Sequence, residues 1–251
     1  ESISGFTTTG ATIFRDIESL PRGILFWRSL TQWIGGITVI TLSLHIFPVV
    51  RSLNVQLPAT EFSGIMSDKI HPRVIETAKR LILVYVVLTI AEVILLVLGK
   101  MPVFEAICHS FSTLSTGGFS TRNGGITAFS SQYIKTVFIL FMFFAGINPA
   151  LFYFTFKKSF SKIIRNSEFS AYLVMVILFR ALIIFLLFRE GGISLSSAFM
   201  DGLFNTVSVI TTTGFYTVSF NEWGYIVMLV IFFLMFTGGM AGSAGGGIKL
   251  V

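Results

Sequence analysis

Three short segments of the chain share one pattern of hydroxyl-bearing residues followed by glycine. They read ESISGFTTTGATIF at 1–14, HSFSTLSTGGFSTR at 109–122 and NTVSVITTTGFYTV at 205–218. The positions that align are Ser4, Ser112 and Ser208, then Thr8, Thr116 and Thr212, and then Gly10, Gly118 and Gly214. A pattern that returns about every hundred residues indicates one structural unit used several times.

The residue types in this pattern suit the coordination of a hard monovalent cation. Threonine offers a hydroxyl and a carbonyl oxygen, and glycine permits backbone angles that direct successive carbonyls toward one axis. Rings of carbonyls from TVGYG loops form the filter of K⁺ channels in this way. We name the three tripeptides the filter strips: Thr8, Thr9 and Gly10; Thr116, Gly117 and Gly118; Thr212, Thr213 and Gly214. One copy alone could be a polar kink or re-entrant loop, but three copies favour an ion path.

The composition of the chain places these strips in an integral membrane protein. Hydrophobic residues are 53% of the chain and charged residues 12%, whereas a soluble domain has roughly 25% charged residues. Apolar segments of about the 20 residues that a spanning helix needs lie at 29–50, 80–99, 133–156, 170–189 and 224–238. The amphipathic segments 103–115 and 198–211 are predicted to be pore helices that enter the membrane part-way. The strips cannot face lipid, because their backbone would lack hydrogen-bond partners there.

The distribution of positive charge predicts which side the strips face. Two loops are rich in basic residues, namely Arg51, Lys69, Arg73, Lys79 and Arg80 in one, and Lys157, Lys158, Lys162 and Arg165 in the other. Cytoplasmic loops carry such an excess, so we expect the strips on the outer side. Four arginines near the strips weaken the contrast: Arg15, Arg22, Arg28 and Arg122. The net charge of +6 then reflects topology and contact with anionic inner-leaflet lipid, and no aromatic-basic pattern indicates nucleic-acid binding.

The order of these elements predicts an all-α polytopic membrane protein built from repeated units. Each unit consists of an outer helix, a pore helix, a filter strip and an inner helix. The expected units are 1–55, 56–165 and 166–251, the first beginning at its pore helix or strip and the third ending within or after a glycine run. Three strips around one axis leave a gap, so we expect a fourth unit after Val251.

A glycine-rich segment, GGMAGSAGGGIK at 238–249, is predicted to interrupt the last inner helix. Glycine costs a helix roughly 1 kcal/mol relative to alanine, so this run should form a loop beneath the strips. The candidate residues of this loop are Gly238, Gly239, Gly242, Ser243, Gly245, Gly246, Gly247 and Lys249. The alternative is helix packing through small residues spaced by four. A phosphate loop is excluded, because no Lys-Ser/Thr pair follows the glycines.

Several other residues invite a functional interpretation. Arg180 and Glu92 lie inside apolar segments, where charge is functional by default, although a structural ion pair or a subunit contact explains them equally well. Asn148-Pro149 predicts a bend, because proline removes a backbone donor. The three histidines and the single Cys108 lack the spacing of a metal site or a disulfide framework. Because no nucleophile, base and orienting group occur together, we do not expect an enzyme.

Longer stretches of the sequence resemble one known family. These are SISGFTTTGAT, FWRSLTQWIGGI, STGGFST, FAGINPALFY, TTTGF and GGMAGSAGGGIK, which together cover nearly the whole chain. They are similar to the TrkH-type subunits of the Trk/Ktr/HKT superfamily of K⁺ transporters. The resemblance implies four pseudo-symmetric repeats and K⁺ coordination at the filter-strip residues alone. It also implies that the glycine-rich segment at 238–249 obstructs the pore as a gate, and we name its candidate residues the gate loop. The outer helix of repeat one and all of repeat four are missing from the match.

The resemblance also implies details of selectivity and assembly. A glycine at Gly10, Gly118 and Gly214 is similar to the K⁺-permeable members, whereas Na⁺-selective relatives carry serine in the first strip. Gly117 departs from the threonine of the other strips, and we expect its missing side chain to loosen that wall. The implied setting is a homodimer in the bacterial cytoplasmic membrane, with a cytosolic nucleotide-binding subunit of the TrkA type. K⁺ is the transported ion, and no cofactor is implied.

A secondary carrier that couples K⁺ to Na⁺ or H⁺ is the alternative from another functional class. Carriers place ions at broken helices near the midplane, often between inverted repeats. The three strips lie on one side in the predicted topology, whereas inverted repeats would alternate. The sequence therefore favours a channel-like pore over a carrier.

Overall fold

A computed structural model describes residues 1–52, 74–156, 166–190, 195–218 and 223–250. The helices and strands are α1 Ser2–Phe6, α2 Arg22–Ser52, α4 Val74–Leu98, α5 Val103–Leu114, the 3-10 helix η2 Gly125–Ala128, α6 Gln132–Ala145, α7 Pro149–Phe156, α9 Ser167–Glu190, α10 Leu195–Ile210, α11 Gly224–Leu234, β1 Thr237–Met240 and β2 Ile248–Leu250. The predicted helical class is confirmed, with two short paired strands as the exception.

Two of the described helices, α4 and α9, are long and apolar enough to cross a membrane. Most of their exposed side chains are hydrophobic, and on α4 these recur every three or four residues. On α4 this exposed stripe consists of Leu83, Val87, Ile90, Ile94 and Leu98. An apolar stripe on the outside of a helix whose other face is buried is the arrangement expected next to hydrocarbon.

The second inner helix is broken at the predicted bend. Helix α6 ends at Ala145 and α7 begins at Pro149, where proline is tolerated because the first helical N–H has no partner in any case. The Asn148 side-chain Oδ1 accepts a hydrogen bond from the backbone N–H of Ala150 at 2.9 Å and so caps α7. The expected span 133–156 is therefore two helices, and the expected bend is confirmed.

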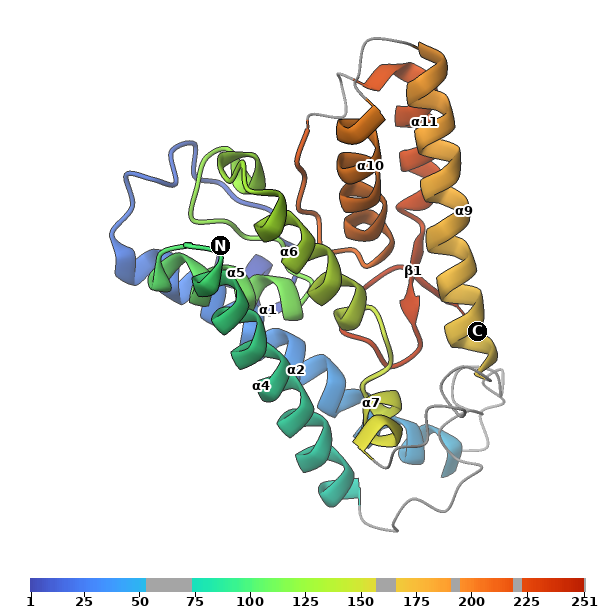
Figure 1. The fold of residues 1–251 in the computed structure, drawn as a ribbon. Coiled ribbons are helices and arrows are strands. Elements are labelled where there is room, and N and C mark those ends of the chain that lie inside the picture. Colours follow the sequence, from blue (N-terminus) through green and yellow to red (C-terminus); the bar gives the residue numbers. More distant parts are fainter. Residues whose placement is uncertain (53–73, 157–165, 191–194, 219–222, 251) are drawn as a thin grey trace.

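The two complete pore helices have equivalent surroundings. Pore helix α5 packs against α4, α6 and the earlier helix α2, and pore helix α10 packs against α9, α11 and the earlier helix α6. Figure 1 shows α10 beside α9, and α5 between α4 and α6. Each pore helix thus contacts its own outer and inner helices and the inner helix of the preceding unit. The expected boundaries at 55/56 and 165/166 adjoin or fall within segments outside the described residues.

Equivalent tyrosines join neighbouring units at the inner helices. The Tyr85 hydroxyl of α4 donates to the carbonyl of Trp33 at 3.3 Å, and the Tyr172 hydroxyl of α9 donates to the carbonyl of Phe143 at 3.2 Å. Three residues after each acceptor stands a glycine whose added β-carbon would meet that tyrosine hydroxyl, at 2.7 Å for Gly36 and 2.5 Å for Gly146. Gly36 and Gly146 are therefore equivalent positions in the two units. Aligning α2 and α6 on these two glycines shows which residues of the inner helices correspond to each other.

Candidate functional site

All three pore helices end in the same backbone turn. The threonine that opens each filter strip has left-handed backbone angles, with φ of 53° at Thr8, 54° at Thr116 and 58° at Thr212. The next N–H donates to the carbonyl of the aligned serine at 2.9 to 3.0 Å, in the pairs Thr9–Ser4, Gly117–Ser112 and Thr213–Ser208. This is the Schellman arrangement, in which glycine normally takes the left-handed position. A β-branched residue there is an outlier, and an outlier that recurs three times indicates a functional constraint on the strips.

The glycines that close strips one and two lie at seams between strips. All three glycines are left-handed, with φ of 76° at Gly10, 76° at Gly118 and 80° at Gly214. A β-carbon added at Gly10 would lie 2.0 Å from the Gly117 carbonyl oxygen, and one at Gly118 would lie 2.1 Å from the Thr213 carbonyl oxygen. At Gly214 such an atom would meet nothing within 4 Å among the described residues. The strips therefore stand side by side in chain order, with the third open on its far side.

The second strip is braced differently from the other two. In strips one and three a pair of threonine hydroxyls hydrogen-bonds at 2.8 Å, Thr7 with Thr9 and Thr211 with Thr213. In strip two the place of a Gly117 side chain is filled by Gln32 of α2, whose Cδ would lie 2.3 Å from an added β-carbon. The expectation that Gly117 loosens this wall is wrong, because a fully buried amide from the preceding unit occupies the space.

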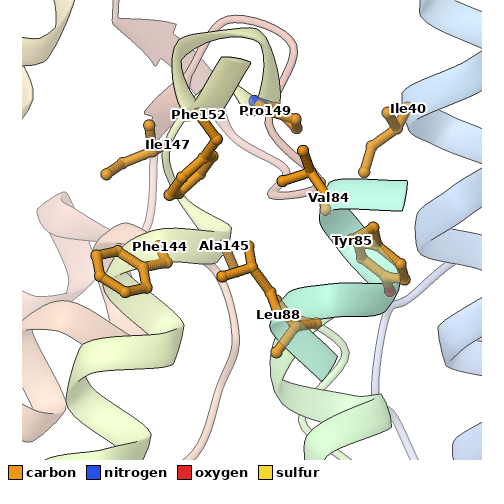
Figure 2. A pocket seen from close by; sticks show the side chains of 11 residues that line it. Ile40, Val84, Tyr85, Leu88, Phe144, Ala145, Ile147, Pro149 and Phe152 are labelled. Atoms are coloured by element: carbon orange, nitrogen blue, oxygen red, sulfur yellow. The ribbon is translucent and has the colours of Figure 1, made fainter. Parts of the chain in front are cut away.

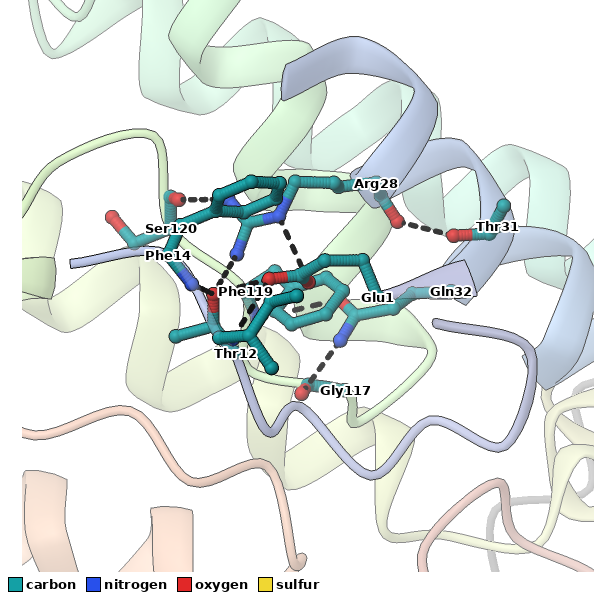
Figure 3. Close-up of polar contacts among 10 residues, drawn as sticks. Glu1, Thr12, Phe14, Arg28, Thr31, Gln32, Gly117, Phe119 and Ser120 are labelled. Carbon is teal, nitrogen blue, oxygen red and sulfur yellow. Dashed lines mark hydrogen bonds and ion pairs between the residues drawn. The ribbon is translucent and has the colours of Figure 1, made fainter. Parts of the chain in front are cut away.

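Arg28, one helical turn before Gln32, ties the segments that follow strips one and two. Its side chain, 3% exposed, pairs with Glu1 at 3.3 Å and donates to the Thr12 hydroxyl at 3.2 Å and to the Ser120 carbonyl at 3.5 Å (Figure 3). Burial raises the pKa of the Glu1 carboxyl, but the Thr12 hydrogen bond and the Arg28 charge outweigh it and hold that pKa below its usual range. Arg28 is therefore a structural cation, which explains why it did not fit the predicted charge asymmetry.

Other charges near the strips are also paired. Arg122, which follows strip two, contacts Glu105 at the start of α5 at 2.6 Å. Lys135 of α6 contacts Asp201 of α10 at 2.9 Å. The first contact fixes the start of α5 against the segment after its strip, and the second joins α6 to the first half of α10.

The gate loop contacts both the third strip and the break in the second inner helix. Helix α11 ends at Leu234, and β1 pairs with β2 across the glycine-rich segment. The N–H of Gly246 donates to the Thr212 hydroxyl at 2.7 Å, and the N–H of Met240 donates to the carbonyl of Gly146 at 2.9 Å. The predicted interruption of the inner helix is confirmed. Because the segment is not helical, the alternative of helix packing through its glycines does not apply.

The glycines of this loop permit close backbone approach. A β-carbon at Gly238 would lie 2.2 Å from the Gly246 carbonyl oxygen, and one at Gly245 would lie 2.8 Å from the Thr211 carbonyl oxygen. The Lys249 ammonium donates to the Ser243 hydroxyl at 3.1 Å and to the Gly245 carbonyl. The loop is thus folded on itself, and the Lys249 ammonium binds oxygen atoms of other residues in the same loop.

An apolar pocket borders the gate loop. Ala244 of the loop lines it together with Ile40 of α2, Val84 and Leu88 of α4, and Phe152 of α7. Figure 2 shows these helical side chains around the break between α6 and α7. At Ala244 one side of the loop therefore faces mainly hydrocarbon side chains.

The remaining candidate residues are not part of the strips themselves. Both carboxylate oxygens of Glu92 are buried without a hydrogen-bond partner among the described residues. The Arg180 guanidinium lies 3.8 Å from the centre of the Phe199 ring. The His109 ring contacts the Glu105 carbonyl and the Ser120 hydroxyl, which is a structural role. His71, and the side chain of His45, lie outside the described residues, within which no group of three metal-binding side chains occurs.

Arg28 and Gln32 are the site residues that sequence reasoning missed. Their signal was present, because a charged and an amide side chain four residues apart share one face of an apolar helix. Both side chains are buried on that face.

Comparison with known proteins identifies the family. The family model TrkH, described as a cation transport protein, matches residues 1–251. This chain belongs to the TrkH family. The Trk system potassium uptake protein TrkH of Vibrio parahaemolyticus is 39% identical over the whole of this chain and 53% of its own length. The protein of the same name in Escherichia coli K12 is 38% identical over the same shares.

A solved structure has the same fold. The crystal structure of the potassium transporter TrkH from Vibrio parahaemolyticus superposes with a TM-score of 0.87 at 36% identity, covering 98% of this chain and 50% of that one. The chain thus spans about half the length of these relatives.

Proposed function

We propose that this chain contributes three walls of a channel-like pore that takes up K⁺ across the bacterial cytoplasmic membrane. The observation that carries the proposal is the left-handed threonine turn, present in three strips that stand side by side. The turn aims backbone groups at a common region without a β-carbon at the closing glycine, as a dehydrated cation requires. The proposed ligands are the filter-strip residues, and the relatives that carry them are named for potassium uptake.

A fourth wall completes this pore in our proposal. The far side of Gly214 is open within the described residues, whereas Gly10 and Gly118 each abut the carbonyl of the next strip. The chain spans 53% of the relatives' length, which leaves room for another strip elsewhere in the full-length protein. The unit boundaries 1–55, 56–165 and 166–251 remain part of this proposal.

The gate loop is proposed to control the flow beneath the strips. Its hydrogen bond to the Thr212 hydroxyl connects it directly to the third strip, and its lysine is bound to its own carbonyls. A cytosolic partner that pulls on the chain beyond Lys249 would break the hydrogen bonds of Gly246 and Lys249 and so open the loop. We propose a TrkA-type nucleotide-binding subunit as that partner, with the pore protein as a homodimer and the strips facing outward.

Uptake of rubidium, a K⁺ substitute, tests this function. The full-length protein is expressed in cells that lack their own K⁺ uptake systems. We expect saturable rubidium uptake that K⁺ inhibits far more strongly than Na⁺ does. This uptake should persist when the Na⁺ and proton gradients are removed and the membrane potential is held constant. Uptake that stops without a Na⁺ or proton gradient would favour the coupled carrier, and no uptake in correctly inserted protein would contradict the proposal.

A further inference from the structure

We propose that Gln32 is a positioning residue for the second filter strip, supplied by the preceding unit. The inference rests on the proposed K⁺ pore and deepens it, because it explains how the strip with a missing threonine keeps its shape. Gln32 lies on α2, 85 residues before the strip in the chain, and its side chain is fully buried.

The two polar atoms of the Gln32 amide bind the backbone of the second strip and of the residue that follows it. Its Nε2 donates to the Gly117 carbonyl at 2.7 Å, and its Oε1 accepts from the Phe119 N–H at 3.3 Å. Figure 3 shows the amide beside Gly117 and Phe119. The two bonds enclose Gly118, the glycine that closes the strip. The side chain thus acts as a short neighbouring strand that fixes the backbone on either side of that glycine.

The Gln32 amide also lies at the seam between strips one and two. The Gly117 carbonyl that it binds is the oxygen against which Gly10 packs, and a β-carbon at Gly10 would lie 3.9 Å from the Gln32 Nε2. A shift of the Gly117 carbonyl would therefore displace strips one and two together. One amide from α2 sets their separation.

A comparison of the three strips indicates what Gln32 replaces. Strips one and three brace themselves with their own threonine pair, whereas strip two has Ser115 and Gly117 at those positions. When α2 and α6 are aligned through Gly36 and Gly146, the residue that corresponds to Gln32 is Met142, a buried side chain without an N–H donor. The helix before strip two thus carries an amide, at Gln32, where that strip has a glycine, Gly117. The helix before strip three carries Met142, where that strip has a threonine, Thr213.

The first test removes the amide in the full-length protein. Gln32→Glu keeps the size of the side chain but replaces the donor to Gly117, and Gln32→Ala removes both bonds. A buried carbonyl without a hydrogen-bond partner is unfavourable, so we expect the preference for rubidium over Na⁺ to fall about tenfold in both variants. Thr38→Val is the control, because this exposed threonine on α2 donates only to carbonyls of its own helix among its described side-chain bonds.

The second test exchanges the two braces. Gly117→Thr alone should abolish uptake, because its β-carbon would lie 2.3 Å from the Gln32 Cδ. In the Gln32→Ala background the same threonine has room and can bind the Ser115 hydroxyl as its counterparts do in the other strips. We therefore expect the double variant to recover uptake and selectivity relative to Gly117→Thr. Such non-additivity measures a direct contact.

Two results would overturn the inference. One is parental rate and selectivity in Gln32→Ala and Gln32→Glu, and the other is equal damage by Gly117→Thr with and without Gln32. Either result leaves the proposed pore intact as long as a substitution at Gly118 still changes selectivity. If Gly118 substitutions are silent as well, the pore proposal itself fails.

Discussion

Gly118→Ser is expected to reduce the preference for K⁺ over Na⁺ by at least about tenfold, or to abolish uptake. A β-carbon at this position would lie 2.1 Å from the Thr213 carbonyl oxygen, and the residue has φ of 76°. The left-handed backbone alone costs a residue with a β-carbon about 1–2 kcal/mol. Because the clash is with backbone, strip three must move away from strip two, and the cage between them widens.

Rubidium and sodium uptake in cells without their own K⁺ uptake systems measures this effect. Gly23→Ser is the matched control, since a β-carbon at Gly23 meets nothing within 4 Å and the residue lies at the start of α2. Equal amounts of both variants in the membrane exclude a folding defect. Unchanged rate and selectivity for Gly118→Ser would remove the second strip from the ion path.

Loosening the gate loop is expected to raise K⁺ flux in the absence of the regulator. Deletion within Gly242–Gly247 removes the contact with strip three, and Thr212→Val removes only the hydroxyl that accepts from Gly246. The loss of one hydrogen bond is worth about 1 kcal/mol, so Thr212→Val should raise basal flux about fivefold. The deletion should raise it further and weaken dependence on the regulator.

Selectivity separates the gate from the filter in this experiment. Ion preference should stay near the parental value in the deletion variant, because every residue of the filter strips is intact. Thr212→Val alters a filter-strip residue and is therefore compared on basal flux alone. Gly246→Ala is the control: it keeps the N–H that binds Thr212, and its β-carbon would lie no closer than 3.7 Å to its neighbours. Well-folded loop variants with parental basal flux and parental regulator dependence would contradict the gate.

The sequence predicted the elements whose signals are local. Segment 103–115 was expected as a pore helix and is found as the helix Val103–Leu114. Its signal is local, because the helical spacing of its apolar residues lies within the segment itself. The bend at Asn148-Pro149 and the interruption at the glycine run followed from the backbone chemistry of proline and glycine. The family followed from long stretches of similar sequence, and the family match confirms it.

Contacts between units were beyond the reach of the sequence. The left-handed angles of Thr116 oppose the preference of a β-branched residue, so no local rule predicts them. The Gln32–Gly117 hydrogen bond joins residues 85 positions apart, and only the folded arrangement of α2 beside α5 brings them together. For that reason Gly117 was interpreted as a weak point, whereas the structure shows its side-chain space to be occupied.

The location of the bound ion decides whether the three strips form an ion path. Crystals of the full-length protein soaked in thallium or rubidium salts would reveal the ion by its anomalous scattering. The account predicts a peak bordered by the strips at Thr8–Gly10, Thr116–Gly118 and Thr212–Gly214, with reduced occupancy in Gly118→Ser. A peak elsewhere, for example at the buried Glu92 carboxylate, with none between the strips would contradict it.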